Sequence, residues 1–184
     1  TRDALVEANK KNRPGEYAKL VRRLHDADIA VEGGFIFGFD AHRPGVFAET
    51  VTAADAIGVD TAHFTILTPL PGTQTFSRLH GEGRIFDYDW SHYNAYRTLF
   101  HPQHMSPATL DGGLRWAYNA FYGTSVRRRR TLNQLRRRSP TMAAAYRFVG
   151  RSYSKHYGAN LHMAGEAPFA PHPDDLEHLA TASK

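Results

Sequence analysis

The chain has 184 residues and no cysteine, 41% of its residues are hydrophobic, and its net charge of +5 is concentrated in one arginine-rich segment. This length suits one domain with an appendage, while the lack of cysteine excludes a disulfide framework and an iron–sulfur cluster ligated by this chain. The sequence has no run of about eighteen apolar residues and no signal peptide pattern, so we expect a cytoplasmic protein without a membrane span. Its polar, helix-like start at Thr1 favours a piece of a longer protein.

Residues 5–28 are predicted to form a helix, which Pro14 and Gly15 interrupt and which is firmer from Glu16 onward. An apolar stripe at helical spacing marks the side that we expect to be buried. The stripe consists of Tyr17, Leu20, Val21 and Leu24.

Residues 29–37 are predicted to form a strand. Their apolar positions do not alternate cleanly, which is typical of a strand covered on both faces, as in a parallel sheet. Gly34 and Gly38 are unusual here, because strand glycines often mark the close approach of a ligand or of another backbone. Tight packing of helices on the strand is the alternative explanation.

The next elements complete a strand–helix–strand unit. Residues 46–57 have apolar positions at helical spacing, and Gly58 suits the left-handed position that ends a helix. Residues 61–68 form the second predicted strand, and Pro69 stops its hydrogen-bonded ladder. Short connections between these elements predict parallel pairing of the two strands.

Two charged residues follow these elements, at the carboxyl ends of strands where ligands bind in parallel α/β architectures. Asp40 follows the first strand and either binds a cationic or hydroxylated ligand group or caps the next helix. Arg84 follows a short helix predicted for residues 75–82. It either pairs with a carboxylate or is an ordinary surface arginine.

Residues 87–104 are aromatic and polar without a clear period, which fits either a cover over a pocket mouth or a packed irregular connection. The histidines of this stretch lack metal-site spacing, so we predict no metal site. Ser106 and Pro107 then start a helix that Gly123 ends. Its predicted buried stripe consists of Leu110, Leu114, Ala117, Tyr118 and Phe121.

The last third of the chain begins with an arginine-rich helix predicted for residues 125–138, which holds seven arginines between positions 127 and 138. A further helix is predicted for residues 139–157, and residues 158–184 have the composition of a largely disordered tail. The arginine-rich helix is either simply solvated or docks on an anionic membrane surface, and nucleic acid is the less favoured partner.

Three stretches resemble one family of enzymes. Gly34-x-Ile36-x-Gly38 resembles the G-x-I-x-G motif on the fifth barrel strand of radical S-adenosylmethionine enzymes. Residues 64–73, FTILTPLPGT, resemble the sixth strand of that barrel and its following P-x-P-G-T turn. Residues 116–122, WAYNAFY, resemble a W-A-Y-x-x-F-Y phrase in the helical extension of the cobalamin-binding subgroup, which includes the hopanoid methylases.

The resemblance, which covers residues 9–122, implies that a reduced [4Fe-4S] cluster cleaves S-adenosylmethionine to a 5′-deoxyadenosyl radical, which abstracts hydrogen from the substrate. The cofactor-binding residues that it implies are Gly34, Ile36, Gly38, Asp40, Ile66, Leu67 and Thr68. The family's acidic residue falls at Ala41, so Asp40 departs from the pattern by one position. The cluster and any cobalamin would bind outside this chain, in a missing N-terminal half, so we expect the chain alone to be inactive, and no catalytic residue is assigned.

The predicted fold class is therefore α/β, with a partial TIM-type (β/α) barrel in residues 1–86, a helical C-terminal extension in residues 87–157 and the tail in residues 158–184. The predicted function is radical-based modification, such as methylation, of a small organic or lipid substrate, in the cytoplasm or at the membrane periphery. The alternative is a non-enzymatic module that docks on nucleic acid or an anionic membrane through residues 127–138. Since an incomplete barrel has a bare strand edge, we expect the isolated chain to be poorly stable or oligomeric. We expect Gly38→Val to weaken cofactor binding more than stability.

Overall fold

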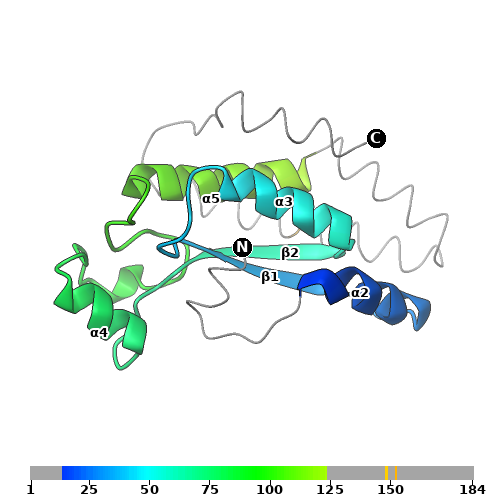
Figure 1. Ribbon diagram of the computed structural model, residues 1–184, viewed down its shortest axis with the longest axis horizontal. Coiled ribbons are helices and arrows are strands. Elements are labelled where there is room, and N and C mark those ends of the chain that lie inside the picture. Colours follow the sequence, from blue (N-terminus) through cyan, green and yellow to red (C-terminus); the bar gives the residue numbers. More distant parts are fainter. Residues whose placement is uncertain (1–13, 124–147, 149–151, 153–184) are drawn as a thin grey trace.

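The computed structural model describes residues 14–123 together with residues 148 and 152 (Figure 1). The predicted α/β character is confirmed, because the described part contains a two-stranded parallel sheet and four α-helices. Its elements in chain order are the 3₁₀ turn η1 (Pro14–Glu16), α2 (Tyr17–Asp26), β1 (Glu32–Phe37), α3 (Val46–Ile57), β2 (Thr61–Ile66), α4 (Gln74–Gly81), the 3₁₀ turn η2 (Trp90–His92) and α5 (Pro107–Tyr122).

Local signals placed the helix ends of α3 and α5 well. Gly58 ends α3 in the left-handed region with a φ of 85°, and its N–H donates to the Ala54 carbonyl. Ser106 caps α5, because its Oγ accepts a hydrogen bond of 3.0 Å from the Thr109 N–H, and Pro107 begins the helix. The predicted bounds of both helices are confirmed.

The first strand is shorter than predicted, because its first predicted residues belong to the turn that ends α2. Ile29 donates its N–H to the Leu24 carbonyl at 2.9 Å, and Asp28 has a left-handed φ of 57°. The chain therefore reaches β1 only at Glu32. In α2 itself Val21 is buried, but Leu20 is 52% exposed, so the predicted apolar stripe was wrong at Leu20.

One face of the sheet is covered by α3 and α5, which lie side by side above it in Figure 1. Phe37 and Phe64 stack at 5.8 Å between ring centroids, and Phe47 meets Phe37 edge-on at 4.8 Å. Residues on both sides of the predicted boundary at 86 belong to this core, since Phe64 also contacts Phe121 of α5 edge-on.

The opposite face of the sheet is exposed at β1. Glu32, Gly34 and Ile36 are exposed, whereas the residues between them are increasingly buried toward Phe37. The prediction that this strand is covered on both faces was therefore wrong for the described part of the chain. The sequence does not show this alternation of buried and exposed positions, because Gly33 on the inner face and Gly34 on the outer face have no side chains to indicate which face is buried.

The two edges of the sheet differ. Among the described residues no strand pairs with the outer edge of β1. The outer edge of β2 is instead closed by side chains of α5: the Tyr122 hydroxyl bonds both backbone groups of Ala62, and the Tyr118 hydroxyl bonds both backbone groups of Phe64.

The carboxyl ends of both strands meet α4 and the loops around it, at the left of Figure 1. Thr73 caps α4, and the helix runs one residue earlier than predicted. Residues 98–100 form a packed irregular connection, in which Leu99 and Phe100 are fully buried and Phe100 bridges to Ile85. By contrast Trp90 is 57% exposed, so the aromatic stretch is only partly packed.

Several predictions fall outside the described residues. These are the helix expected over 125–138, the helix expected over 139–157 apart from residues 148 and 152, which are helical, the tail over 158–184, and the first residues of the helix expected over 5–28. Within the part of the chain that the structure describes, none of the helices has the length and apolar character needed to cross a membrane.

Candidate functional site

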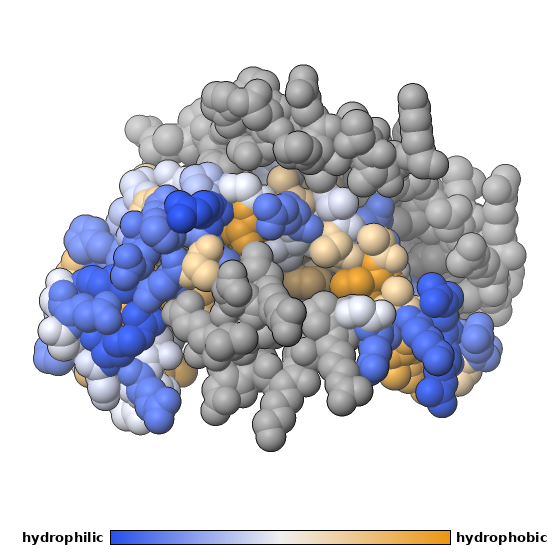
Figure 2. All heavy atoms as spheres, in the orientation of Figure 1, coloured by the Kyte–Doolittle hydropathy of each residue, from blue (hydrophilic) through white to orange (hydrophobic). Residues whose placement is uncertain are grey.

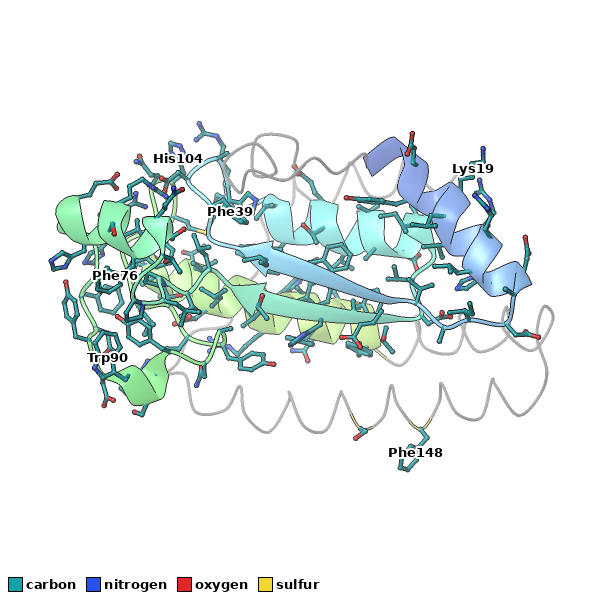
Figure 3. All side chains as sticks on the ribbon, turned by 90° about the horizontal axis from the view of Figure 1, so that it is seen from below. Lys19, Phe39, Phe76, Trp90, His104 and Phe148 are labelled. Atoms are coloured by element: carbon teal, nitrogen blue, oxygen red, sulfur yellow. The ribbon has the colours of Figure 1, made fainter. Side chains whose placement is uncertain are left out.

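The exposed face of the sheet carries two of the predicted cofactor-binding residues. Gly34 and Ile36 point to this face, and their register partners on β2 are His63 and Thr65. A Cβ placed on Gly34 would meet no atom within 4 Å, and Ile36 is 39% exposed. The exposed face therefore carries bare backbone at Gly34 and one apolar side chain, that of Ile36. Figure 3 views the molecule from this side.

The cofactor-binding residues predicted in and after β2 do not lie on this exposed face. Ile66 is 1% exposed and points to the opposite face, where it belongs to the core beneath α5. Leu67 packs against the same core, and its N–H donates to the Phe37 carbonyl at 2.8 Å. Thr68 follows the strand, and its hydroxyl bonds the Ile66 carbonyl. The exposed face instead carries the side chains of His63 and Thr65, which sequence reasoning missed. Their alternation with the apolar Phe64 and Ile66 was the sequence signal that could have identified them.

Gly38 has a different environment from Gly34. Its φ of 101° lies in the region that L side chains rarely adopt, and a Cβ there would lie 3.1 Å from Leu110 and 3.3 Å from Phe100. The alternative of tight packing therefore describes Gly38, whereas Gly34 faces open space. A valine at position 38 would disturb this packing directly, which contradicts the expectation that stability changes less than cofactor binding.

His42 fixes the backbone at Gly38. Its Nδ1 accepts a hydrogen bond of 3.2 Å from the Gly38 N–H, and its ring meets the Phe39 ring edge-on at 5.3 Å. The side chain is buried, and this burial lowers the pKa of His42 to about 4. The imidazole is consequently neutral at pH 7, which suits its role as an acceptor.

Asp40 is the centre of an ion-pair cluster at the carboxyl end of β1. Arg84 Nη2 lies 2.7 Å from Asp40 Oδ1, and Arg78 donates to the other carboxylate oxygen. Burial opposes the ionisation of Asp40, but both guanidiniums outweigh it and hold the pKa of the carboxyl below its usual value. Of the two alternatives for Arg84, pairing with a carboxylate is the one observed, and Gly45 rather than Asp40 occupies the N-cap of α3.

Arg84 connects this cluster to the following loop. Its Nε donates to the His101 carbonyl at 2.8 Å, its Nη1 lies 2.8 Å from Glu82 Oε2, and its guanidinium lies 5.8 Å from the centroid of the Phe100 ring. Figure 2 shows many hydrophilic residues over this α4 end of the described part. The cluster thus holds the loop after β1 against α4, and its charges compensate one another.

A polar row crosses the exposed face beside Gly34. Tyr96 OH lies 2.7 Å from His63 Nε2, and His63 Nδ1 lies 4.0 Å from Glu32 Oε1. Tyr96 reaches this position because the neighbouring Ala95 carbonyl accepts a hydrogen bond of 2.8 Å from the Ile66 N–H. No regular pattern around residue 96 signals this contact in the sequence.

The described residues contain no group of three or more histidine, cysteine, aspartate or glutamate side chains that could hold a metal ion. The chain has no cysteine either, so a thiolate-bound iron–sulfur cluster does not fit its residues. On the exposed face, the bare backbone at Gly34 leaves open space next to the exposed Ile36.

Comparison with known proteins gives relatives of two kinds, although no protein-family model matches the chain. The chain is 30% identical to a bacteriochlorophyllide d C-12(1)-methyltransferase of Chlorobaculum tepidum over 129 aligned residues. This alignment covers 69% of this chain and 28% of that protein. The chain is 31% identical to an anaerobic magnesium-protoporphyrin IX monomethyl ester cyclase of Cereibacter sphaeroides over 139 aligned residues. This alignment covers 70% of this chain and 22% of that protein. An uncharacterized methyltransferase of Pyrococcus horikoshii is 29% identical over 109 residues, 59% of this chain and 24% of that protein. The chain therefore spans less than a third of the length of these relatives.

Proposed function

We propose that the chain is the C-terminal part of a radical S-adenosylmethionine enzyme that modifies a tetrapyrrole-like substrate, most simply by methylation. The observation that carries the proposal is the position of Gly34, which lies open on the exposed sheet face within the G-x-I-x-G motif. The relatives support the substrate class, because their names specify a bacteriochlorophyllide and a magnesium protoporphyrin ester. Two of the three relatives named above are methyltransferases, which supports the reaction.

A larger barrel accounts for the asymmetry of the sheet. The inward side chains of a (β/α) barrel lie opposite the helices, and the exposed face bearing Gly34 and Ile36 would be that interior. The outer edge of β1 would pair with a preceding strand, while β2, whose outer edge bonds Tyr118 and Tyr122, would be the last strand. We propose that the preceding strands belong to the same longer protein.

Within such a barrel the residues of this chain would bind and orient the cofactor. Gly34 lets a flat base lie against the strand, and Ile36 contacts its face. The Asp40–Arg84 pair holds the loop at the carboxyl end of β1, where ligands of parallel α/β architectures bind. S-adenosylmethionine, when bound with a reduced [4Fe-4S] cluster, supplies a carbon radical. The cluster ligands, and any cobalamin site, would come from residues outside this chain.

The test uses the full-length enzyme to which we assign the chain, reconstituted anaerobically with iron, sulfide and a reductant. We expect S-adenosylmethionine to be converted to 5′-deoxyadenosine, and a magnesium-tetrapyrrole substrate to gain the mass of one methylene group. Gly34→Val should abolish the nucleoside product, because its side chain fills the space over the strand. Gly81→Val is the matched control, since it adds the same side chain at an exposed position with no neighbour within 4 Å. A reconstituted enzyme that does not cleave S-adenosylmethionine, or equal activity of both variants, would refute the proposal.

A further inference from the structure

The loop of residues 86–99 lies at the end of the sheet where ligands of parallel α/β architectures bind. A β-bridge between Ile85 and Phe100 closes this loop at its base. Arg84, the residue before the bridge, is the partner of Asp40, which follows β1. The loop therefore starts and ends beside the carboxyl ends of the strands, next to α4 (Figure 1).

Three large aromatic side chains at the start of this loop are exposed. The exposed fraction is 57% for Trp90, 47% for Phe86 and 46% for Tyr88. Two of these rings pack against a neighbouring ring. Trp90 lies 4.8 Å from Tyr93 between ring centroids, and Phe86 lies 5.0 Å from His101. A single exposed apolar residue is ordinary, but aromatic side chains gathered on one short loop indicate a binding surface.

Hydrogen bonds to two aspartates hold the loop in one conformation. Asp87 Oδ1 accepts a hydrogen bond of 2.9 Å from the Asp89 N–H, and Asp87 Oδ2 lies 2.8 Å from His92 Nδ1. The Tyr93 hydroxyl donates to the Asp87 carbonyl at 2.9 Å. Asp89 Oδ1 accepts from both the N–H and the hydroxyl of Ser91. A surface that is ordered in this way loses little conformational freedom when a ligand binds.

Tyr88 connects the loop to α4. Its hydroxyl lies 2.9 Å from His80 Nδ1, and the His80 ring stacks on the Phe76 ring at 5.6 Å between centroids, with 7° between the ring planes. Figure 3 shows Phe76 and Trp90 at the same end of the molecule, beyond the carboxyl ends of the strands. Aromatic rings thus line this end from α4 to the loop.

These rings favour a flat aromatic ligand. Rings that are fixed and half exposed offer π faces on which a flat conjugated system stacks. Two of the relatives are named for a bacteriochlorophyllide and a magnesium protoporphyrin ester, whose macrocycles are systems of this kind. The carboxylates of Asp87 and Asp89 oppose the alternative of an anionic membrane surface, which attracts basic segments.

We infer that Trp90 stacks on the macrocycle of a tetrapyrrole substrate and that Tyr88 adds a second aromatic contact. This inference rests on the proposed function and deepens it, since it assigns the contact with that substrate to named residues of this chain. Trp90 contributes most of the contact, because its ring system is larger than those of Phe86 and Tyr88 and is more exposed.

The experiment measures how tightly the full-length enzyme binds protoporphyrin IX and protoporphyrinogen IX, by titration under anaerobic conditions. Both probes carry the same side chains, but the saturated bridge carbons of the porphyrinogen prevent a flat ring. We expect the wild type to prefer the flat probe by about fivefold to a hundredfold, the value of one stacked aromatic side chain. Trp90→Leu should lose most of this preference, and Trp90→Phe should keep part of it.

Leu20→Ala is the matched control. It removes an apolar side chain that is 52% exposed on α2, at the opposite end of the sheet, and it should keep the preference for the flat probe (Figure 1). An equal loss in Leu20→Ala and Trp90→Leu would show nonspecific adhesion of the porphyrin to apolar surface, and it would overturn the inference.

The other outcomes separate this inference from the function on which it rests. If the wild type binds the flat probe and Trp90→Leu binds it equally tightly, Trp90 does not contact the macrocycle, and the inference fails alone. A change confined to self-association, measured by sedimentation of Trp90→Leu, would make the loop a protein interface and would also refute the inference alone. If the wild type binds neither probe, the inference and the proposed substrate class fail together.

Discussion

The Tyr122 hydroxyl accepts a hydrogen bond of 3.0 Å from the Ala62 N–H and donates one of 2.8 Å to the Ala62 carbonyl. A single side chain of α5 thereby satisfies both outward-facing backbone groups of one strand residue. Tyr118 does the same for Phe64, at 3.1 and 2.8 Å. Two hydroxyls thus replace the backbone of a neighbouring strand, which explains how an apolar strand ends a sheet without an exposed edge.

Removing either hydroxyl should destabilise the fold and promote association through β2. Tyr118→Phe or Tyr122→Phe leaves one N–H and one carbonyl buried without these partners, at a cost of about 1–3 kcal/mol for each variant. Chemical denaturation measures the cost, and analytical ultracentrifugation measures association. Tyr93→Phe serves as the control, because its hydroxyl bonds a carbonyl in the loop at Asp87. Unchanged stability of both α5 variants would contradict the role of the hydroxyls.

The isolated 184-residue chain should associate through the outer edge of β1. That edge has no strand partner among the described residues, and it lies beside the exposed Ile36. We expect Ile36→Lys to shift the chain toward monomer in sedimentation, because a charge on an edge strand opposes further pairing. Leu20→Lys, at an exposed apolar position on α2, is the control. A wild-type chain that is monomeric and melts cooperatively would count against an incomplete barrel.

Alanine should be tolerated at Gly34 and harmful at Gly38. The left-handed φ of Gly38 and the nearby Leu110 side chain predict a loss of about 1–3 kcal/mol for Gly38→Ala. Gly34→Ala meets open space in a strand and should be neutral or slightly stabilising. Urea denaturation of both variants measures their free energies of unfolding. Equal changes in the two variants would contradict the predicted difference between Gly34 and Gly38.

Acid should weaken the fold through His42 before it protonates Asp40. The pKa of His42 falls from 6.5 to about 4 in the folded state, so an unfolded chain binds the proton more readily. The stability that the neutral ring contributes is therefore complete above 6.5 and is lost as pH falls toward about 4. His42→Asn retains an acceptor for the Gly38 N–H and should flatten the dependence in this window, whereas His104→Asn, at an exposed position, should not. Denaturation at several pH values gives the comparison, and an NMR titration that places the pKa of His42 near 6.5 would contradict it.

The Asp40 cluster should respond to acid in a lower window. Its carboxyl pKa lies below 3.8, so the stabilisation is present above that value and disappears as pH falls through the lowered pKa. At neutral pH Asp40→Asn should cost about 1–2 kcal/mol, because Arg84 keeps its charge in a largely buried position. The difference from wild type should shrink in strong acid. Asp26→Asn, an exposed aspartate at the end of α2, is the reference variant, and a cost that does not depend on pH would argue against the ion pair.

Signals confined to a few neighbouring residues predicted the helices well. Gly58, Ser106 and Pro107 act through their own backbone and caps, so α3 and α5 began and ended where the sequence placed them. Pairing with a carboxylate was one of the two alternatives for Arg84, and its partner Asp40 lies 44 positions away.

The faces of the strands were harder to predict, because they depend on contacts across the chain. Ile66 points to the core since α5 lies on that side, and the only local signal for this is the alternation of the polar His63 and Thr65 with apolar neighbours. The contact between His63 and Tyr96 spans 33 positions. It depends on the hydrogen bond between the Ala95 carbonyl and the Ile66 N–H of β2. The sequence thus supplied the motif at Gly34 and Ile36, while the polar residues beside it emerged only from the pairing of strands and loops.

The spacing of Tyr118 and Tyr122 also limits how far a helix can imitate a strand. Four residues of helix advance about 6 Å, and two residues of strand advance about 6.6 Å, so an antiparallel helix and strand fall out of step by about half an ångström at each repeat. The next position along α5 in this series is Leu114, which has no hydroxyl, and opposite it the Ile66 N–H turns to the Ala95 carbonyl instead. Two successive tyrosines of α5 thus bond the edge of β2, and a loop makes the third contact, which brings Tyr96 next to His63.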